Sequence, residues 1–96
     1  MNLAMYNSGT QTEELVLTEE QVKELNQLIL WNDDVNTFDH VITTLMELCG
    51  HSEEQAHQCA LIVHNNGKCS VKRGEIETLR PICTAILDRG ISATID

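Results

Sequence analysis

The stretch Leu28-Ile29-Leu30-Trp31-Asn32-Asp33-Asp34-Val35-Asn36-Thr37-Phe38 decides the fold. Its apolar beginning is typical of a short buried strand, and the Asn-Asp-Asp triplet ends that strand in a polar turn. Asn36 is a favoured N-cap residue, with Thr37 at the first helical position and Asp39 placed to reach back. The stretch therefore predicts a strand that passes through a polar turn into a helix.

Two helices follow this turn. Apolar residues recur every three or four positions from Phe38 to Cys49, which predicts one buried helical face, and Gly50 is well placed to end the helix. The run Ser52-Glu53-Glu54-Gln55 matches a capping box that begins a second helix, and Asn65-Asn66-Gly67 ends it. The row of side chains predicted to face inward on the second helix is Ala56, Cys59, Ala60, Ile62 and Val63.

The last third of the chain predicts a strand, a helix and a strand. Residues 68–72 alternate weakly, as in a short strand, and Gly74 leads into a third helix that contains Pro81 and is predicted to kink there. Gly90 ends the third helix, and an alternating apolar pattern then predicts a final strand. The inward rows are Ile76, Leu79, Cys83, Ile86 and Leu87 on the helix, and Ile91, Ala93 and Ile95 on the strand. The expected class is α+β, in the order β-α-α-β-α-β, with helices covering one sheet face.

Composition limits the function classes. The 96 residues include 6 Lys or Arg and 15 Asp or Glu, a formal net charge of −9 with the histidines neutral. Binding to duplex nucleic acid or to an anionic membrane requires cations, so both partners are disfavoured. Aromatic residues make up 3%, too few for a platform that stacks bases. The charge instead favours partners with a cationic surface.

The chain is expected to comprise a flexible acidic extension over residues 1–26 and one domain over residues 27–96. The first 20 residues show no signal-peptide pattern, and no apolar run approaches the roughly 20 residues of a membrane span. Four cysteines without a CxxC pair are typical of reduced core thiols. These features favour a cytoplasmic protein, and the spacing of histidines and cysteines predicts no metal site or other cofactor.

A second stretch, Val63-His64-Asn65-Asn66-Gly67-Lys68, helps to interpret the Asn32-Asp33-Asp34 turn. Together, and at this separation, the two motifs resemble the ClpS family, adaptors that deliver substrates to the AAA+ unfoldase of the Clp protease. The resemblance covers residues 27–68 well and residues 72–96 loosely. It implies a small three-stranded antiparallel sheet covered by three helices, and a protein that is not an enzyme.

The resemblance also implies the site and the partners. The family binds N-degrons, which are protein N-termini that begin with a bulky hydrophobic residue. Its amine-binding residues correspond to Asn32, Asp33 and His64, which offer an amide oxygen, a carboxylate and an imidazole nitrogen as acceptors. Docking to the N-terminal domain of a Clp unfoldase, of the ClpA or ClpC type, corresponds to Glu75 and Arg80. The hydrophobic pocket corresponds to Phe38, Val41, Ile42, Ala60 and Val63, with Thr43 and Thr44 beside them; the family commonly has methionine at positions 38 and 60.

Other interpretations of the residues stay open from sequence alone. The Asn32-Asp33-Asp34 triplet is also typical of a simple turn before a helix, and His64 of a residue that stabilises helix C-terminal carbonyls. A non-catalytic structural interaction module of a larger assembly would need no amine-binding pocket and would expose a contiguous apolar patch. A cysteine hydrolase would need a thiol within reach of a histidine, yet each cysteine is predicted to lie on an apolar face or at a strand start.

Overall fold

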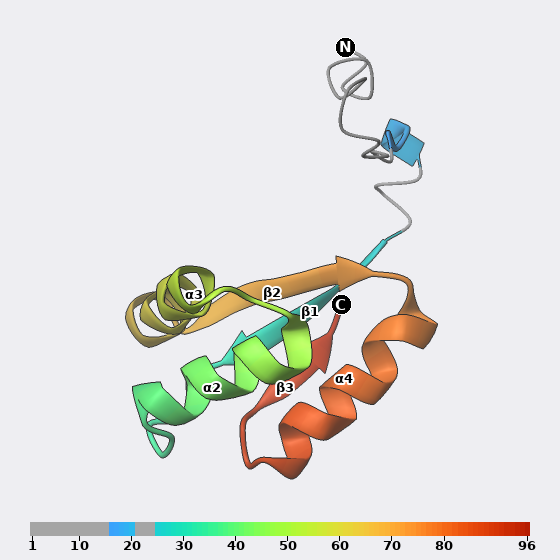
Figure 1. The fold of residues 1–96 in the computed structure, drawn as a ribbon. Coiled ribbons are helices and arrows are strands. Elements are labelled where there is room, and N and C mark those ends of the chain that lie inside the picture. The colour runs from blue at the N-terminus through green and yellow to red at the C-terminus, as the bar shows by residue number, and fades with distance from the viewer. Residues whose placement is uncertain (1–15, 21–24) are drawn as a thin grey trace.

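The computed structural model describes residues 16–20 and 25–96 of the chain. Within the second range the order is β1 (Asn26–Trp31), α2 (Phe38–Cys49), α3 (Glu53–Asn66), β2 (Lys68–Gly74), α4 (Ile76–Asp88) and β3 (Ala93–Ile95) (Figure 1). The predicted α+β class and element order are therefore confirmed. The prediction of a flexible acidic extension concerns residues that lie mostly outside the described part.

The three strands form one antiparallel sheet in the order β2-β1-β3. The predicted buried strand β1 is central, so Leu30 lies opposite Cys69 of β2 on one side and Ala93 of β3 on the other. The β1–β2 register shifts between Leu28 and Ile29, which marks a bulge. Because β1 is central, the turn that follows it is held by both neighbouring strands.

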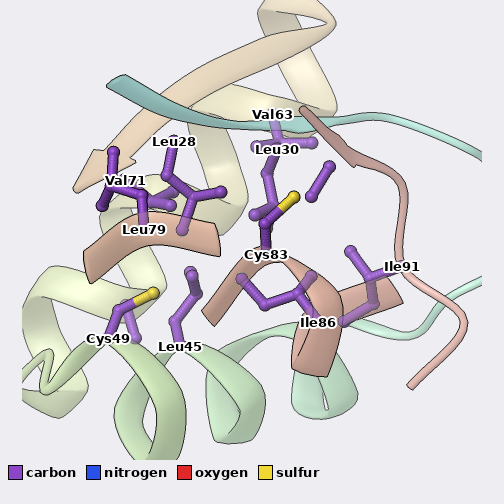
Figure 2. Close-up of a cluster of buried hydrophobic side chains, with 12 residues drawn as sticks. Leu28, Leu30, Leu45, Cys49, Val63, Val71, Leu79, Cys83, Ile86 and Ile91 are labelled. Atoms are coloured by element: carbon purple, nitrogen blue, oxygen red, sulfur yellow. The ribbon is translucent and has the colours of Figure 1, made fainter. Parts of the chain in front are cut away.

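The core lies between the sheet and the helices, on the sheet face that bears Leu28 and Leu30 (Figure 2). Helices α2 and α4 contribute Leu45, Leu79 and Ile86, all fully buried. Helix α3 packs against α2 and β2. The alternation of a strand explains why one β1 face supplies two leucines to a single cluster. The cluster is completed by Cys49, Ala56, Val63, Val71, Cys83, Ile91 and Ala93.

Most helix ends agree with the sequence, and one does not. Gly50 and Gly67 both adopt positive φ at the ends of α2 and α3, and the Ser52 hydroxyl accepts a hydrogen bond from the Gln55 N–H at the start of α3. The N-cap of α2, however, is Thr37 and not Asn36, because the Thr37 side chain accepts from the His40 N–H. Asn36 has a different role, described below.

Two side chains predicted to face inward are partly exposed. Ile62 on α3 is 39% exposed, and Leu87 on α4 is 49% exposed. Each neighbours a buried residue in sequence, Val63 and Ile86, and lies about 100° around the helix from it, toward the outer side. Pro81 lies inside α4 as predicted. No helix in the described ranges is long and apolar enough to cross a membrane.

Candidate functional site

The two sequence motifs meet at the end of β1. The Asn32 N–H donates to the Gly67 carbonyl at 2.9 Å, so the residue after β1 is bonded to the residue after α3. The neighbouring pair Trp31 and Lys68 is in register between β1 and β2, and the Lys68 ammonium lies 5.2 Å from the centre of the Trp31 ring. Gly67 adopts φ +92° and ends α3. Its hydrogen bond to Asn32 holds this end of α3 against the Asn32-Asp33-Asp34 turn.

Between the motifs lies a cavity of about 240 Å³. One water needs about 10–15 Å³ of such space, so the cavity has room for a large apolar side chain. Its floor is apolar, formed by the buried Leu30, Ala60, Val63 and Ile91 and by the half-buried Val41. Its other lining residues are aromatic or polar: Trp31, Asn32, Asp33, Asp34, Asn36, Phe38 and His64.

The Asp33 carboxylate is held rigidly at this cavity. Its Oδ1 accepts the backbone N–H groups of Val35 and Asn36 at 3.1 and 3.3 Å, and its Oδ2 accepts the Asn36 side-chain amide at 2.7 Å. Burial by itself would raise the pKa of this carboxyl. These hydrogen bonds and one from the Ser92 backbone outweigh burial and lower the pKa below its usual value. Asp33 is therefore an oriented anion at neutral pH.

Asn36 is a site residue that the sequence analysis missed. It was predicted to cap α2, but its side-chain amide instead donates to Asp33 Oδ2 at 2.7 Å and to the Gly90 carbonyl at 2.9 Å. Asn36 thus connects the Asn32-Asp33-Asp34 turn to Gly90, which follows α4 and lies 54 residues further along the chain than Asn36. A pattern of local capping residues gives no signal for a partner so distant in sequence.

The other two predicted amine-binding residues also lie at the cavity. Asn32 exchanges hydrogen bonds with Asp34: its amide donates to Asp34 Oδ1 at 3.2 Å, and its oxygen accepts the Asp34 N–H at 3.4 Å. Asp34 adopts φ 60°, which a short polar residue tolerates in a turn. The His64 ring meets the Phe38 ring edge to face, with centroids 5.4 Å apart and planes at 89°.

The structure places some predicted site residues elsewhere. Ile42 does not line the cavity, because it lies about 100° around α2 from Val41 and lines a separate groove, together with Thr43. Thr44 is fully buried and accepts a weak hydrogen bond from Arg89 at 3.4 Å. Conversely, five residues line the cavity without having been predicted to do so: Leu30, Trp31, Asp34, Asn36 and Ile91.

The predicted docking residues lie away from the cavity. Glu75 is the N-cap of α4, and both it and Arg80 are exposed. Ile91, which lines the cavity, follows the other end of that helix. A helix of 13 residues is about 20 Å long, so Glu75 and the cavity lie at opposite ends of α4.

Three of the four cysteines are poor nucleophiles in this fold. Burial raises the pKa of the Cys49 and Cys83 thiols, and burial together with the neighbouring Cys69 and Cys49 raises the pKa of Cys59 to about 12. Such groups stay protonated at neutral pH, and the thiolate is the reactive form. In the part of the chain that the structure describes, no cluster of three or more His, Cys, Asp or Glu side chains is arranged to hold a metal ion.

The arrangement suits recognition of a primary ammonium next to a bulky apolar group. An ammonium has three donors and no acceptor, and Asn32, Asp33 and His64 present acceptor atoms beside one cavity. The apolar floor would bury the attached side chain. Because Asp33 is preorganised by its neighbours, no charged group has to be ordered when a ligand binds.

Comparisons with known proteins identify the family of the chain. The model of the family described as "ATP-dependent Clp protease adaptor protein ClpS" matches residues 21–93. The ClpS adapter of Mycobacterium bovis (strain BCG / Pasteur 1173P2) is 34% identical over 67 residues, covering 70% of this chain and 66% of that protein. The adapter of Mycobacterium leprae (strain TN) is 34% identical over the same length and covered to 62%. This chain thus spans slightly less than two thirds of these relatives.

A solved structure shares the fold. ClpS2 of Agrobacterium tumefaciens, bound to L-phenylalaninamide, superposes with a TM-score of 0.73 at 20% identity, covering 76% of this chain and 95% of that one. The fold, the match of the family model over most of the chain and the mycobacterial relatives lead to one conclusion. The chain belongs to the ClpS family of ATP-dependent Clp protease adaptor proteins.

Proposed function

We propose that the protein is a non-catalytic, cytoplasmic adaptor that captures proteins by a bulky hydrophobic N-terminal residue and delivers them to a Clp unfoldase–protease. The observation that carries the proposal is the cavity itself. An apolar floor of buried and half-buried side chains lies directly beside a hydrogen-bonded carboxylate, an amide and an imidazole. Those two features correspond to the two parts of an N-terminal residue, its side chain and its free α-amine.

The ligand of the similar ClpS2 supports this interpretation. L-phenylalaninamide carries a free α-amine and an aromatic side chain, and ClpS2 binds it. In the present chain, each hydrogen bond to a charged group would contribute about 1.5–3 kcal/mol, and burial of a Leu- or Phe-sized side chain about another 1.5–3 kcal/mol. After the cost of association, an affinity of micromolar order is reasonable.

Peptides that differ only in their first residue test this proposal. Fluorescence anisotropy should show that peptides beginning with Leu or Phe bind about 10- to 150-fold more tightly than the same peptide beginning with Gly, because Gly leaves the apolar floor unfilled. A matched peptide with Leu moved to the second position is the control for general hydrophobicity. If the Leu, Phe and Gly peptides bind equally, the cavity is not a side-chain pocket and the adaptor function is wrong.

A structural interaction module is the less favoured alternative. It requires an apolar patch independent of an amine-binding pocket. Trp31 and Phe38, which are 40% and 39% exposed, both line the cavity and so fit the capture of a ligand there.

We assign docking on the N-terminal domain of a ClpA- or ClpC-type unfoldase to Glu75 and Arg80. Both side chains are exposed, and neither has a hydrogen bond or ion pair with another described residue. Their distance from the cavity would let the protein hold a substrate and an unfoldase at the same time.

A Glu75→Ala/Arg80→Ala variant should separate the two activities. We expect its affinity for a Leu-initiated peptide to stay within about twofold of the parent chain, because surface charges so far away are screened by salt. Its affinity for the unfoldase N-terminal domain, measured by calorimetry, should fall at least about tenfold, in line with loss of two charged contacts. A Glu77→Ala variant, altered on the same helix, is the control. Loss of peptide binding in the double variant would mean that these residues belong to the peptide site, and that their assignment to unfoldase docking is wrong.

A further inference from the structure

Two cysteines lie at the interface between α3 and β2. Cys59 is on α3, three positions after the buried Ala56 and four before the buried Val63, so it shares their side of the helix. Cys69 is on β2 opposite Leu30 of β1, so its side chain is on the sheet face that bears the core. Helix α3 packs against β2. The interface therefore has one thiol on each side.

The two thiols are in contact with each other. A side-chain hydrogen bond joins Cys59 and Cys69. The Cys69 thiol donates to the Ser70 carbonyl at 3.5 Å, so the Cys59 thiol is the donor between the two sulfurs. Both cysteines are half-buried and pack against the edge of the hydrophobic core. A small reagent therefore has access to the pair.

The other two cysteines are placed differently. Cys49 and Cys83 are 7% and 8% exposed and lie inside the core (Figure 2). Cys49 affects Cys59 through its charge and not through a hydrogen bond. The contact between two accessible thiols is therefore specific to Cys59 and Cys69.

We propose that Cys59 and Cys69 form a reversible disulfide, and that the oxidant is a low-molecular-weight disulfide of the glutathione class. A disulfide forms where two Cβ atoms approach to about 3.5–4.5 Å, and two thiols in hydrogen-bonding contact are close to that condition. The bond would fasten α3 to β2. This modification is separate from the proposed capture of N-terminal residues, because neither cysteine lines the cavity.

The disulfide forms by two successive exchange reactions. First, the Cys69 thiolate attacks one sulfur of the oxidant, which gives a mixed disulfide and releases one small thiolate. The Cys59 thiolate then attacks the Cys69 sulfur, which gives the internal disulfide and releases the second small thiolate. The two cysteines together lose two protons and two electrons, and the oxidant takes up both as two small thiols.

The order of the two steps follows from the state of Cys59. Burial, together with the neighbouring Cys69 and Cys49, raises the pKa of Cys59 to about 12, so Cys69 begins the exchange. The charge of Cys69 and its hydrogen bond are among the causes of this raised pKa. Both weaken once Cys69 carries the mixed disulfide, because its sulfur is then neutral and no longer a thiol. The pKa of Cys59 therefore falls at the step in which its thiolate is needed.

Oxidation of the parent chain with excess oxidised glutathione tests the proposal. The product should be about 2 Da lighter than the reduced chain, and its only alkylatable thiols should be Cys49 and Cys83. Trypsin cuts after Lys68, between the paired cysteines, so mass spectrometry should find the peptides that carry Cys59 and Cys69 joined. The oxidised chain should unfold at least about 5 °C above the reduced chain, because the bond closes a loop in the unfolded state.

Single variants test the order of the steps. A Cys59→Ala variant should stop at the mixed disulfide and retain one glutathione on Cys69, whereas a Cys69→Ala variant should retain far less. A Cys83→Ala variant is the matched control and should form the internal disulfide as the parent chain does, since Cys83 lies on α4.

Other outcomes would overturn the proposal. A parent chain that keeps four free thiols, or that joins a different pair of cysteines, has no preformed site at the α3–β2 interface. The oxidised chain should also bind a Leu-initiated peptide within about twofold of the reduced chain, because neither cysteine lines the cavity. Loss of peptide binding on oxidation alone would mean that the bond distorts the fold, and would contradict two thiols already placed to form it.

Discussion

An Asp33→Asn variant should bind a Leu-initiated peptide about 10- to 150-fold more weakly than the parent chain, the range expected for loss of one hydrogen bond to a charged group. The substitution removes the charge and keeps the shape. Oδ2 of the parent chain accepts the Asn36 amide at 2.7 Å. If the amide oxygen of the variant keeps the two backbone hydrogen bonds of Oδ1, an amide nitrogen takes the place of Oδ2, and this nitrogen is a donor. Two donors would then face each other, so both the charge and the orientation of the group would be lost.

The control for this variant is Asp88→Asn, which removes one carboxylate from an exposed position on α4. Thermal unfolding followed by circular dichroism should show the parent fold in both variants, since Asp33 is not part of the buried cluster. Unchanged peptide affinity in a folded Asp33→Asn variant would remove the carboxylate from the amine-binding site.

A His64→Ala variant should bind a Leu-initiated peptide about tenfold or more weakly than the parent chain, because it loses one of the three acceptors beside the cavity. The Asp33 carboxylate is present in both proteins. Hydrogen bonds lower the pKa of Asp33, so it stays ionised at pH 5, and the stability that it contributes is lost only as the pH falls through that lowered pKa.

The matched control is a His57→Ala variant, which changes the other histidine on this face of α3 and should keep the affinity of the parent chain, because His57 lines the groove and not the cavity. Unchanged affinity in a folded His64→Ala variant would exclude the imidazole as an acceptor.

Local patterns predicted the fold well because its signals are local. The apolar run before Asn32 is short and ends in a polar turn, which favours a buried strand, and Gly50 and Gly67 mark helix ends where the backbone adopts positive φ. The exact ends of the helices were harder to predict. Asn36 and Thr37 are both good capping residues, and the structure uses Thr37 because the Asn36 side chain is bonded to Asp33 and Gly90.

The candidate site was only partly predictable. The resemblance of two motifs placed Asn32, Asp33 and His64 together, and all three do line one cavity. Periodicity could not separate Val41, which lines the cavity, from Ile42, which lines the groove, because both lie near the edge of the apolar face of α2. Ile91 and the Gly90 carbonyl reach the site from the far end of the chain, and only the packing of α4 brings them there.

The most direct test of the central claim compares a Leu-initiated peptide with its N-acetylated twin in one titration. Acetylation keeps the side chain that would fill the apolar floor and removes the charge and the donors that Asn32, Asp33 and His64 would contact. We expect the free peptide to bind with micromolar affinity and the acetylated one to bind at least about 100-fold more weakly, as befits loss of more than one charge-assisted hydrogen bond. Equal affinities for the two peptides would contradict recognition of a free N-terminal residue.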